Sequence, residues 1–217
     1  MEAFIQRLQE RLALPLPGEA AQMYMAPSSR RVPPFYLSRS ESHRISSVMI
    51  MLYKEKNQWK FPLIQLPLNS GVHSGQMALP GGRMEESDED RIVTAIRETR
   101  EEIGVESADM QVLGVLTELH IQASQNTVLP VVSYIPGKPE YSPDPAEVES
   151  IHIVTLAEIA DEKRRKVTDI QVTDNITIEA PYYDVEGKII WGATAMILSE
   201  FLHIIREIIP GKTIPSL

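Results

Sequence analysis

The sequence of 217 residues contains no cysteine. This absence excludes disulfide bonds, cysteine-ligated zinc, iron–sulfur clusters and catalysis by a thiol nucleophile. Long hydrophobic runs are missing as well, since apolar stretches such as residues 48–52 are far shorter than the roughly 20 residues of a membrane-spanning helix. Residues 1–15 also lack the basic start and apolar block of a targeting segment. We therefore expect a cytoplasmic protein that has no membrane partner.

Positive charge is scarce in this chain. There are 21 lysine and arginine side chains against 30 aspartate and glutamate side chains, which gives a formal net charge of −9. Clustered basic side chains are what binds nucleic acids and anionic membranes, so the charge balance argues against both kinds of partner. The hydrophobic fraction of 43% is ordinary for a globular protein, and the length suits one large domain.

The chain is expected to divide into an N-terminal extension, residues 1–40, and one domain, residues 41–217. The extension begins with apolar residues at helical spacing over residues 1–13, and a proline-rich, extended arm then packs on the body. In the domain, apolar runs alternate irregularly with helical patterns, which predicts an α/β fold with a mixed sheet covered by helices. Strands are expected at 48–53, 61–66, 112–118, 128–134, 151–154, 170–178 and 188–191, and helices at 88–103, 156–166 and 193–209.

The segment 88–103 has the strongest helical pattern. Ser87 or Asp88 is suited to cap its start, and Gly104 stands where helices commonly end. On a helical wheel the apolar residues form one stripe, which should pack on the sheet. A separate arc of the helix gathers three carboxylates: Glu98, Glu101 and Glu102.

These carboxylates repel one another, because like charges at i and i+4 destabilise a helix by about 0.2–0.5 kcal/mol per pair. One interpretation is a solvated acidic face, softened by pairing of Arg97 with Glu101. The other is that a divalent cation supplies the missing positive charge. Oxygen ligands without cysteine or clustered histidine indicate Mg²⁺ or Mn²⁺.

A glycine-containing turn, Leu79–Arg83, immediately precedes the acidic segment. Such a turn exposes backbone carbonyls to a metal or amides to a phosphate, here beside an arginine. Carboxylates that hold a metal beside a glycine loop provide what hydrolysis of a phosphoanhydride requires.

Residues 82–105 resemble the Nudix box, and the closest correspondence is the run Arg97–Val105. There are two departures from the box. Thr99 occupies a position that is usually apolar, and six residues instead of five separate Gly82 from Glu89. This one-residue insertion is similar to the coenzyme A pyrophosphatase branch of the Nudix family.

The resemblance implies an α/β/α sandwich with a mixed sheet, in which the catalytic helix follows the glycine-rich loop. It also implies roles for individual residues. Glu98, Glu101 and Glu102 would bind Mg²⁺ or Mn²⁺ together with the carbonyl of Gly81. Arg97 would orient the carboxylates, and Glu89 would hold Arg97 as structural support. The catalytic residues would then be Glu98, Glu101, Arg97 and Glu147, the last as a general base from a later loop or as an ordinary loop acid.

The resemblance also implies the substrate class. Gly75 and the run Leu79–Gly82 match the closing part of a coenzyme A signature, whereas Pro67 and Gly71 stand where that signature has arginines. Arg83, His73 and Gly82 are the predicted substrate-binding residues, with His73 alternatively a polar loop residue.

Three functions follow from the sequence. The first is hydrolysis of coenzyme A or its thioesters to 3′,5′-ADP and 4′-phosphopantetheine or its acyl form. The second keeps the chemistry but acts on ADP-ribose, a dinucleotide or another nucleoside diphosphate derivative. The third is a non-catalytic Nudix module that binds ligands, which the complete set of box glutamates argues against. The expected partner is a small nucleotide, and the N-terminal arm and terminal helix are also compatible with a homodimer.

Overall fold

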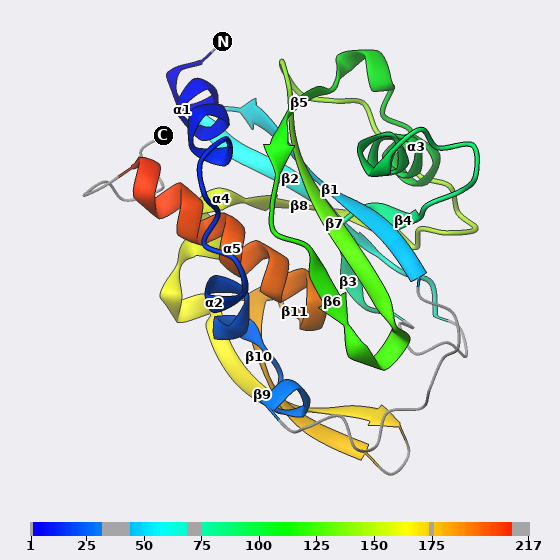
Figure 1. Cartoon of the computed structure of the whole chain (residues 1–217), viewed down its shortest axis with the longest axis vertical. Coiled ribbons are helices and arrows are strands. Elements are labelled where there is room, and N and C mark those ends of the chain that lie inside the picture. The colour runs from blue at the N-terminus through cyan, green and yellow to red at the C-terminus, as the bar shows by residue number, and fades with distance from the viewer. Residues whose placement is uncertain (1, 32–43, 69–74, 174–175, 210–217) are drawn as a thin grey trace.

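The computed structural model describes residues 2–31, 44–68, 75–173 and 176–209. In these ranges the chain forms an eight-stranded mixed sheet, a three-stranded antiparallel sheet and helices that pack on them (Figure 1). The large sheet contains β1 (Arg44–Glu55), β2 (Gln58–Gln65), β3 (Met77–Ala78), β4 (Gly81–Arg83), β5 (Gln111–Val115), β6 (Leu119–Ile121), β7 (Asn126–Ile135) and β8 (Ser150–Thr155). The small sheet contains β9 (Arg165–Thr173), β10 (Ile176–Val185) and β11 (Lys188–Trp191).

The centre of the large sheet is the parallel pair β1 and β7, and the other pairs are antiparallel. β2 pairs with β1 only near their shared hairpin and then continues between β8 and β3. The chain from β3 to β4 crosses from β2 to β1, where Gly82 pairs with Ser47. Because of this crossing, the glycine turn lies within the sheet and in contact with α3 (Arg91–Ile103), the helix that follows it.

Helices cover both faces of the large sheet (Figure 1). α3 (Arg91–Ile103) packs on one face, while α1 (Ala3–Leu12) and α5 (Gly192–Ile208) contact each other on the opposite side. The alternation of β1 explains this arrangement, because Met49 and Met51 belong to the core under α3, and Ile50 and Leu52 belong to the core under α5. The predicted α/β/α sandwich with a mixed sheet is confirmed.

Three predicted elements differ in the structure. The expected strand 112–118 corresponds to β5, which ends at Val115, and the separate strand β6 begins only at Leu119. The expected strand 170–178 spans parts of β9 and β10, which form an antiparallel hairpin. The expected helix 156–166 is short: α4 (Leu156–Ala160) is followed by a 3-10 turn at Glu162–Arg164. Within the described residues, no helix has the length and apolar character to cross a membrane.

The described part of the N-terminal arm is helical rather than extended. α2 (Glu19–Gln22) and 3-10 turns at Met23–Met25 and Ser28–Arg31 follow α1. The fully buried Glu200 of α5 fixes this segment, since its carboxylate accepts hydrogen bonds from Gly18 N, Gln22 Nε2 and Thr117 Oγ1. Four α1 residues join the core under α5: Phe4, Ile5, Leu8 and Leu12. The boundary expected between residues 40 and 41 lies outside the described residues.

Candidate metal centre

α3 begins and ends at well-defined caps. Asp90, in an extended conformation, accepts hydrogen bonds from the backbone N–H groups of Ile92 (2.7 Å) and Val93 (2.9 Å). The expected cap at Ser87 or Asp88 is therefore wrong by two residues or more. Gly104 ends the helix in the left-handed conformation with φ of 72°, as its position in the sequence predicts.

Arg97 is held by Asp88 rather than by Glu89, which corrects the sequence-based assignment. Arg97 Nε and Nη2 donate to the two carboxylate oxygens of Asp88, each at 2.9 Å. The buried Asp88 also accepts from Thr94 Oγ1 and from the backbone of Glu85, and its bond with Arg97 keeps its pKa well below the usual range. Glu89 is exposed.

The insertion in the loop explains the shift from Glu89 to Asp88. If five residues are placed after Gly82, as in the Nudix box, the next residue is Asp88. If the spacing of the box is instead counted backward from Arg97, the residue reached is Glu89. The sequence therefore contained the signal for Asp88, and the choice between the two counts required the folded loop.

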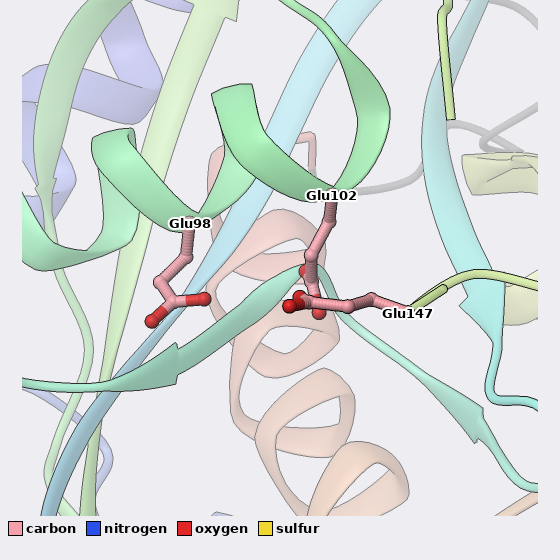
Figure 2. A group of neighbouring side chains, drawn as sticks. All are labelled: Glu98, Glu102 and Glu147. Carbon is pink, nitrogen blue, oxygen red and sulfur yellow. The ribbon is translucent and has the colours of Figure 1, made fainter. Parts of the chain in front are cut away.

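Three carboxylates meet beside α3. Oxygen atoms of Glu98, Glu102 and Glu147 all lie within 4.8 Å of one another. Figure 2 shows Glu98 and Glu102 projecting from successive turns of the helix, while Glu147 approaches from the loop before β8. Sequence periodicity predicts that Glu98 and Glu102 share a face, and the structure adds Glu147 to them.

Glu102 is the most deeply placed of these acids, with only 5% of its surface exposed. Its Oε2 accepts a hydrogen bond of 2.7 Å from the backbone N–H of Gly81. Burial raises the pKa of Glu102 to about 8, and the negative charges of Glu98 and Glu147 add to this effect. Burial also raises the pKa of Glu98, although Arg97 Nη1 donates to its carboxylate at 3.0 Å and opposes the shift.

Glu101, expected among the metal ligands, lies outside this cluster of carboxylates. Its carboxylate accepts a hydrogen bond of 2.8 Å from Arg97 Nη1 and lies 3.7 Å from Arg100 Nη2. The side chain is 45% exposed, so it is free of packing that would prevent another orientation. Arg97 thus contacts Glu98 and Glu101 together, and its role of orienting carboxylates stays a prediction.

Both glycines of the turn are required by close contacts. Gly81 has φ of 149°, and an added Cβ would lie 2.2 Å from the backbone oxygen of Ser47. A Cβ on Gly82 would lie 2.5 Å from the Glu98 carboxylate. The turn is therefore shaped so that the backbone itself touches the carboxylates of α3.

The NUDIX domain family matches residues 43–175, which is more than half of the chain. The chain belongs to the Nudix family. The matched region contains the glycine turn, all of α3 and the loop that carries Glu147.

Curated relatives and solved structures agree with this membership. The chain is 31% identical over 160 residues to an uncharacterized Nudix hydrolase NudL of Escherichia coli, covering 73% of this chain and 81% of that protein. It is 32% identical to Nudix hydrolase 15, mitochondrial, of Arabidopsis thaliana, covering 70% of this chain and 55% of that protein. A Nudix hydrolase from M. Smegmatis, RenU, shares the fold with a TM-score of 0.53 at 13% identity, covering 82% of this chain and 98% of that one. The predicted assignment as a Nudix hydrolase is confirmed.

The carboxylates of this Nudix hydrolase suit a hard divalent cation. Glu98 and Glu102 lie close to Glu147, and the arginine beside them is Arg97. The guanidinium of Arg97 already donates hydrogen bonds to Asp88 as well as to Glu98 and Glu101. A buried carboxylate with a raised pKa is a site where a bound cation would offset repulsion. Glu98, Glu102 and Glu147 therefore form a candidate site for a divalent cation. The carbonyl of Gly81 as a further ligand stays a prediction.

The predicted substrate-binding residues have different outcomes. Gly82 lies against the Glu98 carboxylate, so it borders the candidate centre. Arg83 is exposed, and its backbone carbonyl accepts a hydrogen bond from Arg97 Nη2 at 3.0 Å. His73 lies outside the described residues.

Proposed function

We propose that this Nudix hydrolase cleaves the diphosphate bond of coenzyme A or acyl-coenzyme A with Mg²⁺ or Mn²⁺. The products would be 3′,5′-ADP and 4′-phosphopantetheine or its acyl form. The observation that carries the chemical part of this proposal is the convergence of Glu98, Glu102 and Glu147 within 4.8 Å, beside the glycine turn. In a solvated acidic face all three carboxylates would be exposed to water, whereas Glu102 is buried.

The side chains divide the work of hydrolysis among them. A divalent cation, when bound, neutralises the phosphate oxygens and polarises phosphorus. Glu147 is the exposed member of the cluster, so its carboxylate is suited to take a proton from the water that attacks phosphorus. The bond between phosphorus and the bridging oxygen then breaks, and the leaving phosphate takes the electron pair. Arg97 keeps Glu98 and Glu101 oriented throughout, because Asp88 holds its guanidinium from the other side.

The substrate part of the proposal depends on sequence features around the turn. Gly75 and Leu79–Gly82 keep the spacing of the coenzyme A signature, and Trp191 with the start of α5 also resembles that branch. The missing arginines at residues 67 and 71 favour a second candidate substrate class: ADP-ribose, a dinucleotide or another nucleoside diphosphate derivative. Both classes share the diphosphate bond.

A substrate panel tests the proposal directly. Coenzyme A, acetyl-coenzyme A, ADP-ribose, NADH and a diadenosine polyphosphate are each incubated with Mg²⁺ or Mn²⁺, and products are identified by mass spectrometry. We expect 3′,5′-ADP from coenzyme A at a higher kcat/KM than any product from the others. Hydrolysis of ADP-ribose without coenzyme A would support the second class instead.

The role of the cluster is tested with matched variants. Glu102→Gln is expected to lower kcat by about two to three orders of magnitude while the fold persists, the size of effect typical for lost electrostatic stabilisation. Glu89→Gln, at an exposed position one residue from Asp88, is the control and should retain wild-type turnover. Turnover of Glu102→Gln near that of wild type would remove the cluster from the mechanism.

A further inference from the structure

A polar cluster lies next to the candidate centre, on the strands β2, β8 and β11. Gln65 is its central residue: its Oε1 accepts a hydrogen bond of 2.9 Å from Lys188 Nζ and one of 3.4 Å from Ser150 Oγ. Ser150 Oγ lies 2.9 Å from His152 Nε2. All four side chains are half-buried, so they are shielded from solvent but not enclosed.

Lys188 differs from the other lysines of the described chain in its partners. Four lysines form ion pairs with carboxylates: Lys54, Lys60, Lys138 and Lys166. Lys56 and Lys163 are exposed to solvent. Lys188 is half-buried, yet in the ranges that the structure describes no carboxylate oxygen lies within 4.0 Å of its Nζ. A partly desolvated ammonium whose partner is an amide oxygen lacks the anion that would offset the cost of its burial.

The β10–β11 hairpin fixes the backbone position of Lys188. Lys188 follows the β10–β11 turn, in which Glu186 and Gly187 have φ of 50° and 78°, and it pairs with Val185. The neighbouring His152 is kept uncharged in the neutral pH range, because burial and the charge of Lys188 both lower its pKa, although Glu186 opposes this. The cluster therefore offers one cation together with neutral hydrogen-bonding groups.

Gln65 links this cluster to the Glu147 loop and to the segment that precedes β3. Its backbone carbonyl accepts a hydrogen bond of 2.9 Å from Glu149 N, two residues after Glu147. Its Nε2 donates at 3.4 Å to the carbonyl of Gly75, in the loop that leads to Gly81. Two residues of extended chain span about 7 Å, so the backbone of Gln65 lies close to the segment that carries Glu147.

We infer that Lys188, Gln65, Ser150 and His152 form a subsite for a phosphomonoester of the substrate, separate from the diphosphate that is cleaved. The inference rests on the proposed function in one respect, namely that the diphosphate is bound at the carboxylates. An ammonium is a compact phosphate-binding charge, and the hydroxyl and amide groups supply further hydrogen bonds. The matching ligand is a nucleoside diphosphate derivative whose ribose carries an additional 2′- or 3′-phosphate. Lys188 would then supply a cation that residues 67 and 71 do not.

Calorimetric binding of two nucleotides tests the subsite without hydrolysis. Adenosine 3′,5′-bisphosphate and 5′-AMP differ by one phosphomonoester, and we expect wild-type protein to bind the bisphosphate at least tenfold more tightly. Lys188→Met keeps most of the side-chain volume and should reduce this ratio to near one. Lys166→Met, in the same small sheet, is the control and should keep the ratio. Absence of a preference in wild type, or its persistence in Lys188→Met, would overturn the inference.

Kinetics separate this inference from the proposed function. We expect Lys188→Met to raise KM for coenzyme A about tenfold and to leave the kinetics of dephospho-coenzyme A and ADP-ribose unchanged. Equal losses on all three substrates, with an unchanged melting temperature, would contradict the subsite while leaving the hydrolase proposal intact. If wild-type protein hydrolyses none of them, the proposed function fails, and the binding ratio still decides the subsite.

Discussion

The backbone N–H of Asp144 donates a hydrogen bond of 3.0 Å to the carbonyl oxygen of Glu102. Ser142 N donates to the carbonyl of Ile103 in the same way at 2.9 Å. The last carbonyls of a helix have no hydrogen-bond donor within the helix. Here the loop that carries Glu147 supplies the N–H donors for two of these carbonyls. The end of α3 and the Glu147 loop are therefore joined directly, and the carboxylates of Glu98, Glu102 and Glu147 meet at this junction.

Asp144 is expected to position Glu147. Its Oδ1 accepts from Ala146 N at 2.8 Å, and its carbonyl accepts from Glu147 N at 3.1 Å, which fixes the turn. We expect Asp144→Ala to lower kcat about tenfold and the free energy of unfolding by about 1 kcal/mol, the usual loss for one hydrogen bond. Asp144→Asn retains the acceptor and should restore most of kcat. Steady-state kinetics and urea unfolding measure both; equal kinetics in the two variants would remove Asp144 from this role.

Replacing Asp88 and Glu89 separately distinguishes the structure from the sequence-based assignment. Asp88→Ala leaves Arg97, whose side chain is only 15% exposed, without its bidentate partner. We expect a loss of about 3 kcal/mol in unfolding free energy, typical of a broken buried pair, and lower turnover because Glu98 and Glu101 lose a fixed arginine. Glu89→Ala should change stability by less than about 0.5 kcal/mol, as at most surface positions. Chemical denaturation of the two variants compares them; the reverse order would contradict the observed contacts.

Gly82→Ala is expected to impair the site more than the fold. Its Cβ would lie 2.5 Å from the Glu98 carboxylate, the end of a flexible side chain that is able to move away. We expect turnover to fall at least tenfold and Mn²⁺ to bind more weakly, with a melting temperature within a few degrees of wild type. Gly137→Ala is the control for backbone strain away from the site: its φ is 93°, an added Cβ there meets nothing within 4 Å, and its affinity for Mn²⁺ should be that of wild type. Wild-type Mn²⁺ affinity in Gly82→Ala, measured by calorimetry, would count against a centre at Glu98.

The stability of the metal-free protein is expected to depend on pH through Glu102. The pKa of this carboxyl is raised from 4.5 to about 8 by burial, so folded protein retains a proton that unfolded protein releases. The contribution to stability is fully present below pH 4.5 and is lost as pH rises toward 8. The raised pKa of Glu98 acts in the same direction. Thermal melts in chelator across this range should show a decline that is smaller in Glu102→Gln, and parallel curves for the two proteins would contradict it.

Local sequence patterns predicted much of the fold and half of the site. The 3.6-residue period of α3 is enough to place Glu98 and Glu102 on one face, and Gly104 marks the end of the helix. The continuous apolar run at residues 48–53 likewise predicts a strand, and it forms the buried part of β1. The hairpin of β9 and β10 was missed because its two strands have no distinct apolar pattern of their own, and exposed Val167 and Ile176 sit on them.

Contacts between distant segments set the rest of the site. Glu147 joins Glu102 because amides of the intervening loop complete the end of α3, and no periodicity links positions so far apart. Asp88 rather than Glu89 reaches Arg97 because the inserted residue changes how the loop closes, which two alternative counts along the chain left open. Lys188 reaches Gln65 because β11 lies beside β3 in space.

The sequence alone determined the chemistry of this protein: which acids repeat on one helical face, which glycines precede them, and that no cysteine takes part. These features depend on residue type and on the repeat of a single helix or turn, so neighbouring residues are enough to specify them. The tertiary structure decided which carboxylates share the centre, which acid holds Arg97 and that half-buried Lys188 pairs with an amide oxygen. Those outcomes depend on burial and on pairing across strands, and both arise only when segments far apart in the chain pack together.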